Sequence, residues 1–187
     1  MREIPHYLKD ANMLLSRNGF ITSHVWYHGT SSSLVDSILS AGLKRSGDHL
    51  MNEAAKSTMA TIGNTYHETT EPVFLTPSKE LAYYWAQQTV RRRRLRVDVE
   101  ESPVVFAIAL TQEQHQAVRP DVGAASLLMI KDGQDYLEYV AALYQHCQAG
   151  ELRIELKNAP RLDYLNKLGM AYINEDIKAD FISLVSE

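Results

Sequence analysis

A histidine and a glycine that follow a short hydrophobic run are the first residues in this chain that could carry chemistry. Residues 25–27 are β-branched or aromatic and predict a strand, and His28, Gly29 and Thr30 come directly after them. An imidazole can accept or donate a hydrogen bond, and a glycine lets a ligand come close to the backbone. The pattern therefore predicts a ligand-binding corner at the tip of this strand, although a lone histidine more often bonds to a neighbouring carbonyl group.

A helix is expected to position this corner. Three serines at 31–33 supply N-cap oxygens, with Asp36 as a capping-box partner, and apolar residues recur at helical spacing from Leu34 until Gly42 predicts the end. The backbone N–H groups at the start of a helix are suited to binding phosphate. We therefore expect a strand-to-helix junction with His28 at its mouth and phosphate contacts beside it.

A second strand and helix follow in the same order. The run 73–75 predicts a strand after Pro72, the chain turns at 76–78, and the next helix ends in four consecutive arginines at 91–94. Cations at the end of a helix are favoured by its macrodipole, so these arginines predict a solvated helix end. A phosphate backbone or an acidic protein is the alternative partner for them.

These two corners resemble the nicotinamide-dinucleotide-binding segments of ADP-ribosyltransferases of the diphtheria-toxin and poly(ADP-ribose) polymerase type. The matching segments are 27–30 with 35–38 and 42–43, and 73–79 with 82–84. They cover about a quarter of the chain, in the manner of short motifs. The resemblance implies an α+β domain with split or curved, mainly antiparallel sheets and flanking helices.

The resemblance also implies roles in binding NAD, the cofactor of the family. His28 would hydrogen-bond a ribose, the backbone of Gly29 would hold the nicotinamide carboxamide, and Tyr84 would stack on the nicotinamide ring. Without the resemblance, a tyrosine on an amphipathic helix is a core or surface aromatic residue. Phe74 stands where the family has another tyrosine, which keeps the aromatic face and loses the hydroxyl. The residues expected to contact NAD are His28, Gly29, Thr30, Ser31, Phe74, Leu75, Thr76, Tyr83 and Tyr84.

A carboxylate completes this chemistry, because loss of nicotinamide leaves an oxocarbenium-like sugar whose positive charge an acid stabilises. Segment 137–140 is similar to the Glu-Tyr-Ile segments that carry this acid in the family, so the resemblance implies Glu138. Its apolar neighbours recur at helical spacing, where a glutamate is ordinarily solvated, and Glu155 and Glu175 are the alternatives. The ending 169–173 resembles the closing strands of the fold, including those of RNA 2′-phosphotransferases, and has no glutamate at the strand start.

The function implied by the resemblance is transfer of ADP-ribose from NAD to a macromolecule, protein or nucleic acid, with release of nicotinamide. The catalytic residues would be His28, Tyr84 and Glu138. Two alternatives share the fold. One is an enzyme like the RNA 2′-phosphotransferases, which needs arginines to hold phosphate, and the other is a binding module that has lost the acid.

Periodicity along the rest of the chain predicts further helices and strands. The expected elements are an amphipathic helix within 1–19, a polar loop over 44–71 with a short helix at 51–59, a buried strand at 104–110, helices at 112–118 and 135–149, a half-exposed strand at 152–156, and a last pair of strands at 170–173 and 181–185 around a turn. No repeat or linker interrupts them. The order fits one α+β domain over residues 1–187.

Composition limits the class of protein. With 187 residues, 45% hydrophobic and 22% charged, the chain is typical of one globular domain, and a net charge of −4 does not indicate a general nucleic-acid binder. The single cysteine, Cys147, excludes an intramolecular disulfide and a cysteine-built zinc site, and no histidine–acid spacing indicates another metal site. No run has membrane-spanning length and no secretory signal is evident, so we expect a soluble, cytoplasmic protein without membrane contacts, of open oligomeric state.

Overall fold

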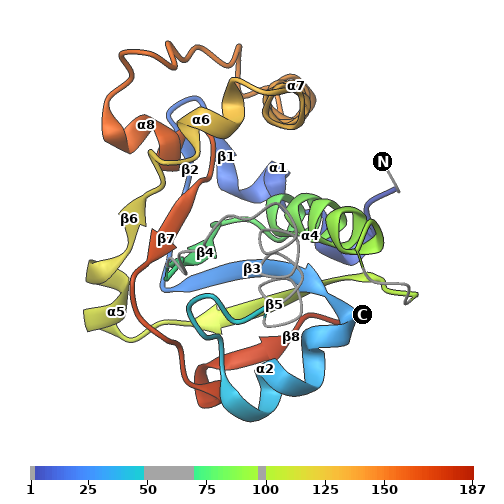
Figure 1. The fold of residues 1–187 in the computed structure, drawn as a ribbon. Helices are drawn as coiled ribbons and strands as arrows, with labels where there is room; N and C mark the ends of the chain where they lie inside the picture. The colour runs from blue at the N-terminus through green and yellow to red at the C-terminus, as the bar shows by residue number, and fades with distance from the viewer. Residues whose placement is uncertain (1–2, 49–69, 97–99) are drawn as a thin grey trace, which may run out of the picture.

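Two three-stranded antiparallel sheets, a two-stranded hairpin and the helices around them make up the described part of the chain (Figure 1). The structure is a computed structural model, and it describes residues 3–48, 70–96 and 100–187. The mixture of helices and antiparallel strands confirms the predicted α+β class. The helix predicted at 51–59, and most of the loop predicted around it, lie outside the described residues.

In each of the two larger sheets the central strand is paired on both sides. The first contains β3 (Val25–Ser31), β5 (Pro103–Ala109) and β8 (Ile182–Leu184), in that order. The second contains β4 (Val73–Leu75), β7 (Ala171–Ile173) and β6 (Arg119–Pro120), in that order. The strand predicted at 104–110 is confirmed as β5, and its central place explains why it is apolar on both faces.

One antiparallel bridge links the two sheets. The N–H of Tyr27 donates to the carbonyl oxygen of Thr76 at 2.9 Å, and the N–H of Thr76 donates back to Tyr27 at 3.0 Å. The bridge sets β3 beside β4, so the strands follow one another in the order β6–β7–β4–β3–β5–β8. The two corners that the sequence singles out are therefore neighbours in space.

Helices form layers on both sides of the first sheet (Figure 1). α4 (Lys79–Arg94) lies across β3 and β5, and α7 (Lys131–His146) packs on the outer side of α4. α2 (Val35–Ala41) packs at the opposite side through Ile38, in a core shared with Trp26 and Phe106. Within the described ranges, no helix combines the length and apolarity needed to cross a bilayer.

The remaining elements are short. They are η1 (His6–Leu8), α1 (Ala11–Leu14), β1 (Leu15–Ser16), β2 (Gly19–Phe20), η2 (Ser32–Leu34), α5 (Gln112–Ala117), α6 (Ala125–Leu128), α8 (Arg161–Asn166) and η3 (Ala179–Phe181). α5 confirms the helix predicted at 112–118, and α7 confirms the one predicted at 135–149, although it both starts and ends earlier.

The start of α4 is capped from two places in the chain. The hydroxyl of Ser78 accepts a hydrogen bond from the N–H of Leu81, as an N-cap residue does. The buried carboxylate of Asp10 accepts from the hydroxyl of Ser78 and from the N–H of Lys79, the latter at 2.7 Å. The N-terminal segment therefore fixes the position at which α4 begins.

The helix predicted within 1–19 is wrong. The segment forms η1, the single turn α1 and the hairpin β1–β2, in which Leu15 pairs with Phe20 and Gly19 adopts a φ of +105°. The apolar residues at helical spacing are still buried, since Leu8, Ala11 and Leu15 all lie in the core. They reach it from separate short elements, because Asp10 is engaged by α4 and the chain turns back at Gly19.

Two strand predictions near the C-terminus also need correction. Residues 152–156 alternate between half-buried and exposed as predicted, but they pair with no other strand of the described chain. The last two strands, β7 and β8, belong to different sheets. The segment between them pairs instead with Leu43, two residues after the end of α2, through reciprocal hydrogen bonds between Ile177 and Leu43.

Candidate functional site

His28 lies inside β3 and not at its tip. The strand runs on to Ser31, and the register with β5 continues from His28 opposite Phe106 to Ser31 opposite Pro103. The predicted strand end after Tyr27 is therefore wrong by four residues. A residue inside a strand has its neighbours fixed on both sides, so the surroundings of His28 follow from the sheet.

Backbone groups of β3 point alternately toward β5 and toward β4. At the two ends of the strand, His24 accepts from Leu110 and Ser32 donates to Ser102, so even-numbered residues bond toward β5. Tyr27 bonds toward β4 through the bridge to Thr76. The N–H and C=O of Gly29 must likewise point toward β4. Neither group has a hydrogen-bond partner among the residues that the structure describes.

The side chain of His28 explains why Gly29 is unpaired. Phe74 is two residues from Thr76, so the carbonyl of Phe74 points toward β3. If the ladder continued, this carbonyl would accept a hydrogen bond from the N–H of Gly29. Instead, the Nδ1 atom of His28 lies 2.8 Å from that carbonyl oxygen. The imidazole thus occupies the line between the two strands. We call this place the β3–β4 junction and define it by His28, Gly29 and Phe74.

The hydrogen bond to Phe74 decides which tautomer His28 adopts. A carbonyl oxygen can only accept, so the proton must be on Nδ1. Burial lowers the pKa of His28 below its ordinary value, and the bond to the Phe74 carbonyl offsets only part of this effect. Near neutral pH the ring is therefore uncharged, and Nε2 has a free lone pair. No partner of Nε2 is found within the described part of the chain.

Gly29 is also the point where α4 approaches β3 most closely. A Cβ atom built on Gly29 would lie 1.8 Å from the carbonyl oxygen of Ala82. Only glycine permits this packing, which gives its presence a structural reason that the sequence did not suggest. Side chains alternate along a strand, so His28 faces away from α4.

The serine corner after β3 is closed by hydrogen bonds within the protein. The N–H of Ser33 donates to the hydroxyl of Ser31, and the N–H of Ser32 donates to the carbonyl of Ser102. Thr30 and Ser31 are both buried, and the Ser31 hydroxyl donates to Glu101 at 2.8 Å. The N–H groups of Ser32 and Ser33, two of the donors expected to contact phosphate here, are therefore already bonded. α2 also begins later than predicted, at Val35 and without a side-chain cap.

Arg93 anchors this corner and was not predicted to do so. Its guanidinium is 1% exposed, and Nε lies 2.8 Å from a carboxylate oxygen of Glu101. It also bonds the hydroxyl of Ser33 and the carboxylate of Asp48. The hydrogen bonds from Arg93 hold the pKa of Glu101 below its usual value. The predicted solvated helix end is correct for Arg91, Arg92 and Arg94, which are exposed, and wrong for Arg93.

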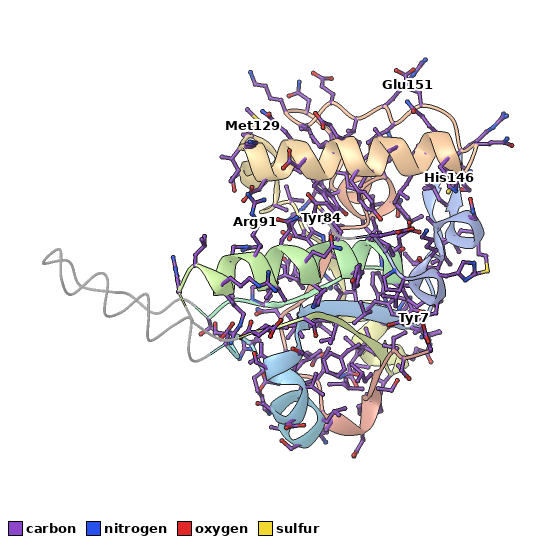
Figure 2. All side chains as sticks on the ribbon, turned by 90° about the vertical axis from the view of Figure 1, so that its right-hand side faces the viewer. Tyr7, Tyr84, Arg91, Met129, His146 and Glu151 are labelled. Atoms are coloured by element: carbon purple, nitrogen blue, oxygen red, sulfur yellow. The ribbon has the colours of Figure 1, made fainter. Side chains whose placement is uncertain are left out.

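The two tyrosines of α4 do not face His28. The ring of Tyr84 stacks on Tyr139 of α7, with centroids 5.0 Å apart and planes at 23°. Tyr83 packs against Leu8 and Val105, on the side of β3 and β5 that α4 covers. Figure 2 shows Tyr84 on the side of α4 that faces α7. α4 therefore lies between Tyr84 and β3.

Glu138 lines the same cleft between α4 and α7 as Tyr84 does. The other two candidate acids are exposed: Glu155 accepts from the side-chain amide of Asn158 at 2.9 Å, and Glu175 follows β7. β7 itself begins at Ala171, which pairs with Leu75.

Comparison of the chain with models of protein families, with curated proteins and with solved structures gives no match. A function for the chain must therefore be inferred from its own sequence and geometry.

The structure divides the predicted site residues into two groups. His28 meets the backbone of Gly29 and Phe74 at the β3–β4 junction. The side chain of Phe74 is 45% exposed and lies on the other side of the sheet from His28, because Val73 and Leu75 beside it share the core of Trp26. Thr76 forms the bridge beside them, and the side chain of Leu75 is buried in the core. The second group, Tyr84 and Glu138, meets in the cleft on the far side of α4. The sequence alone could not reveal the Phe74 carbonyl as the partner of His28.

Proposed function

We propose that this protein is an NAD-dependent transferase of the ADP-ribosyltransferase type, with the nicotinamide end of the cofactor bound at the β3–β4 junction. The observation that carries the proposal is the unpaired backbone of Gly29 next to the neutral imidazole of His28, within the described part of the chain. The sequence resemblance gives these two residues their roles, and their adjacency supports it. The cytoplasm, where NAD is abundant, is the proposed setting.

The unpaired groups of the junction match the chemistry of the cofactor. A carboxamide has one carbonyl acceptor and an NH2 donor, which complement the N–H and C=O of Gly29. The lone pair on Nε2 of His28 can accept a hydrogen bond from a ribose hydroxyl.

The proposed reaction breaks the bond between the ribose carbon and the nicotinamide nitrogen. Nicotinamide leaves with the bonding electrons, and a nucleophile on a protein or nucleic acid forms a new bond to the same carbon. A carboxylate near the ribose would stabilise the developing charge. Glu138 lies in the cleft between α4 and α7, so the whole of α4 separates it from the junction.

The alternative reaction is that of an RNA 2′-phosphotransferase-like enzyme, and one observation favours it. β7, the strand that resembles a closing strand of the family, begins with Ala171 beside Leu75 of β4. Its first residue is therefore not an acid. In that reaction the 2′-phosphate of RNA would attack the ribose carbon of NAD, and nicotinamide would again leave. The chain would then need no glutamate at this place.

Calorimetry with NAD tests the shared part of both proposals. We expect the unaltered chain to bind NAD and His28→Ala to bind it at least about tenfold more weakly, since one hydrogen bond to the ligand is lost. Arg92→Ala is the matched control, because Arg92 is exposed on α4, and it should bind as the unaltered chain does. Equal affinity of the His28→Ala variant would remove the proposal.

The reaction itself is decided by following two labels. NAD labelled in the adenylate phosphate reports transfer of ADP-ribose to protein or nucleic acid, and RNA labelled in a 2′-phosphate reports phosphate transfer. Release of nicotinamide is measured in parallel. Binding of NAD without release of nicotinamide would identify a binding module that has lost the acid.

A further inference from the structure

A cleft between α4 and α7 lies away from the β3–β4 junction and has a volume of about 720 Å³. This is within the range of about 300–1,000 Å³ that is usual for small-molecule sites. α4 contributes Tyr84, Arg91 and Arg94 to its lining, and α7 contributes Asp135 and Glu138. Figure 2 shows α4 and α7 side by side, with Tyr84 and Arg91 along the same helix.

The charges in this cleft are divided between its two walls. Arg91 and Arg94 are three residues apart on α4, and Asp135 and Glu138 are three residues apart on α7, so each pair shares one face of its helix. Among the described residues, none of these four groups forms an ion pair with another protein group. Arg94 donates one hydrogen bond, to the backbone carbonyl of Glu101 at 3.3 Å. The cleft therefore has one cationic wall and one anionic wall that do not neutralise each other directly.

The hydroxyl of Tyr84 has no hydrogen-bond partner in the described structure, although the side chain is only 1% exposed. A buried hydroxyl without a partner is costly, and native proteins retain few of them. The charged groups that act on this hydroxyl include Asp135 and Arg91, one from each wall of the cleft. Burial, followed by the effect of Asp135, raises the pKa of Tyr84 to about 12, so the hydroxyl keeps its proton and can donate.

We propose that this cleft binds a small, linear zwitterion of zero net charge, such as a guanidino or amino carboxylic acid. Its carboxylate would accept hydrogen bonds from Arg91, Arg94 and the Tyr84 hydroxyl. Its cationic end would lie between Asp135 and Glu138. The Tyr139 ring beside Glu138 adds an aromatic face that attracts a guanidinium group. The ligand would satisfy the charges of both walls and the buried hydroxyl together.

Calorimetry with three matched probes tests the ligand class. The probes are γ-guanidinobutyrate, which has both charged groups, butyrate, which has only the anion, and butylguanidine, which has only the cation. We expect the zwitterion to bind at least about tenfold more tightly than either of the others, because removing one charged end of the ligand should weaken binding by a factor of about ten or more. Equal affinities, or no binding of the zwitterion, would overturn the proposal.

Tyr84→Phe distinguishes a ligand contact from a structural one. The variant should bind γ-guanidinobutyrate about tenfold more weakly while its melting temperature is unchanged or raised, because no protein group loses a partner. Tyr136→Phe is the matched control, since the buried Tyr136 hydroxyl donates to the carbonyl of Leu168. That variant should melt at a lower temperature and keep its affinity for the zwitterion.

A lower melting temperature of Tyr84→Phe would show that its hydroxyl is bonded within the protein, and it would overturn the assignment. Glu138→Gln should weaken binding of the zwitterion and leave binding of butyrate unchanged. The affinity for NAD should not change in any of these variants, because α4 separates the cleft from the β3–β4 junction. The two proposed sites can therefore fail independently.

Discussion

The Nδ1 atom of His28 lies 2.8 Å from the carbonyl oxygen of Phe74, on the line where β3 and β4 would otherwise continue to pair. The two residues are 46 positions apart in the chain. Their contact stops the ladder after the bridge between Tyr27 and Thr76, and it leaves the backbone of Gly29 without a partner in the described structure. This interruption of the sheet leaves unpaired the N–H and C=O of Gly29, which we propose as the groups that bind NAD.

Two substitutions at position 28 should distinguish the role of Nδ1 of the imidazole from that of Nε2. The amide of His28→Asn can reach the Phe74 carbonyl in place of Nδ1, but it offers nothing in place of Nε2. We expect this variant to keep a free energy of unfolding within about 1 kcal/mol of the unaltered chain and to lose about tenfold in affinity for NAD. Denaturation in urea and calorimetry with NAD are the measurements.

His28→Gln is the companion variant, because its longer side chain places an amide nearer to the position of Nε2. It should retain more affinity for NAD than His28→Asn does, and it should unfold more easily because the Phe74 carbonyl loses its donor. The opposite ranking of the two affinities would mean that Nε2 does not contact the cofactor.

Acidification should destabilise the protein through His28. Burial lowers the pKa of His28 in the folded chain below its ordinary value of 6.5, so the unfolded chain binds more protons once the pH falls through that value. The contribution of His28 to the free energy of unfolding must then decrease as the pH is lowered from about 7.5 to about 5, and it must increase again on return. We expect this slope to be smaller in His28→Asn, which has no imidazole. Urea denaturation of both proteins across this range is the test, and parallel profiles would contradict it.

Arg93 should be the arginine of the run 91–94 on which stability depends most. Its guanidinium is buried and bonds Glu101, so Arg93→Ala would leave a buried carboxylate without its cation. Loss of one member of a buried ion pair costs about 3–5 kcal/mol. The exposed Arg92 is the control, and Arg92→Ala should stay within about 0.5 kcal/mol of the unaltered chain. Equal effects of the two substitutions on chemical denaturation would argue against the buried network.

The ion pair with Arg93 also predicts that stability depends on pH through an acidic group, the carboxylate of Glu101. The pKa of Glu101 is lower in the folded chain than its ordinary value of 4.5, so its contribution to stability is present above that pH. It should be lost as the pH falls through the folded pKa. Glu101→Gln should remove this acid sensitivity, which acid denaturation followed by circular dichroism would measure.

Gly29→Ala should displace α4 from β3. The added methyl group would collide with the carbonyl oxygen of Ala82, which is backbone and cannot rotate away. Overpacking of this kind costs about 1–3 kcal/mol or more. Gly123→Ala is the matched control, because its added atom would meet only a side-chain oxygen of Asp121 at 3.4 Å. Thermal unfolding of both variants should show a clear loss for the first and little change for the second.

Local patterns in the sequence predicted the elements better than their connections. The apolar run of β5, the turn at 76–78 before α4 and the Gly42 end of α2 follow from residue type alone, and the structure has all three. The strand predicted at 152–156 is wrong, because alternation of apolar and charged residues indicates one buried and one exposed face but does not identify a pairing partner. Pairing depends on residues far away in the chain.

The candidate site was predictable in part for the same reason. His28 and Gly29 stand out by type and position, but the partner of the imidazole is a backbone carbonyl, which every residue has. The burial of Arg93 had a signal in the sequence, because it lies seven residues after Ala86 on the stripe of α4 that faces β3. Tyr84 follows Tyr83 directly, and only the packing of α7 shows to which side each ring turns.

The carboxylate of Asp10 completes the first turn of α4, although 68 positions separate it from Ser78. During synthesis the segment that supplies this acid leaves the ribosome long before the helix that it stabilises. The two can join only after the start of α4, which begins at Lys79, has been synthesised. Proteolysis that removed the first ten residues would therefore weaken an interior helix and the sheet beneath it, and would do more than shorten a loose end.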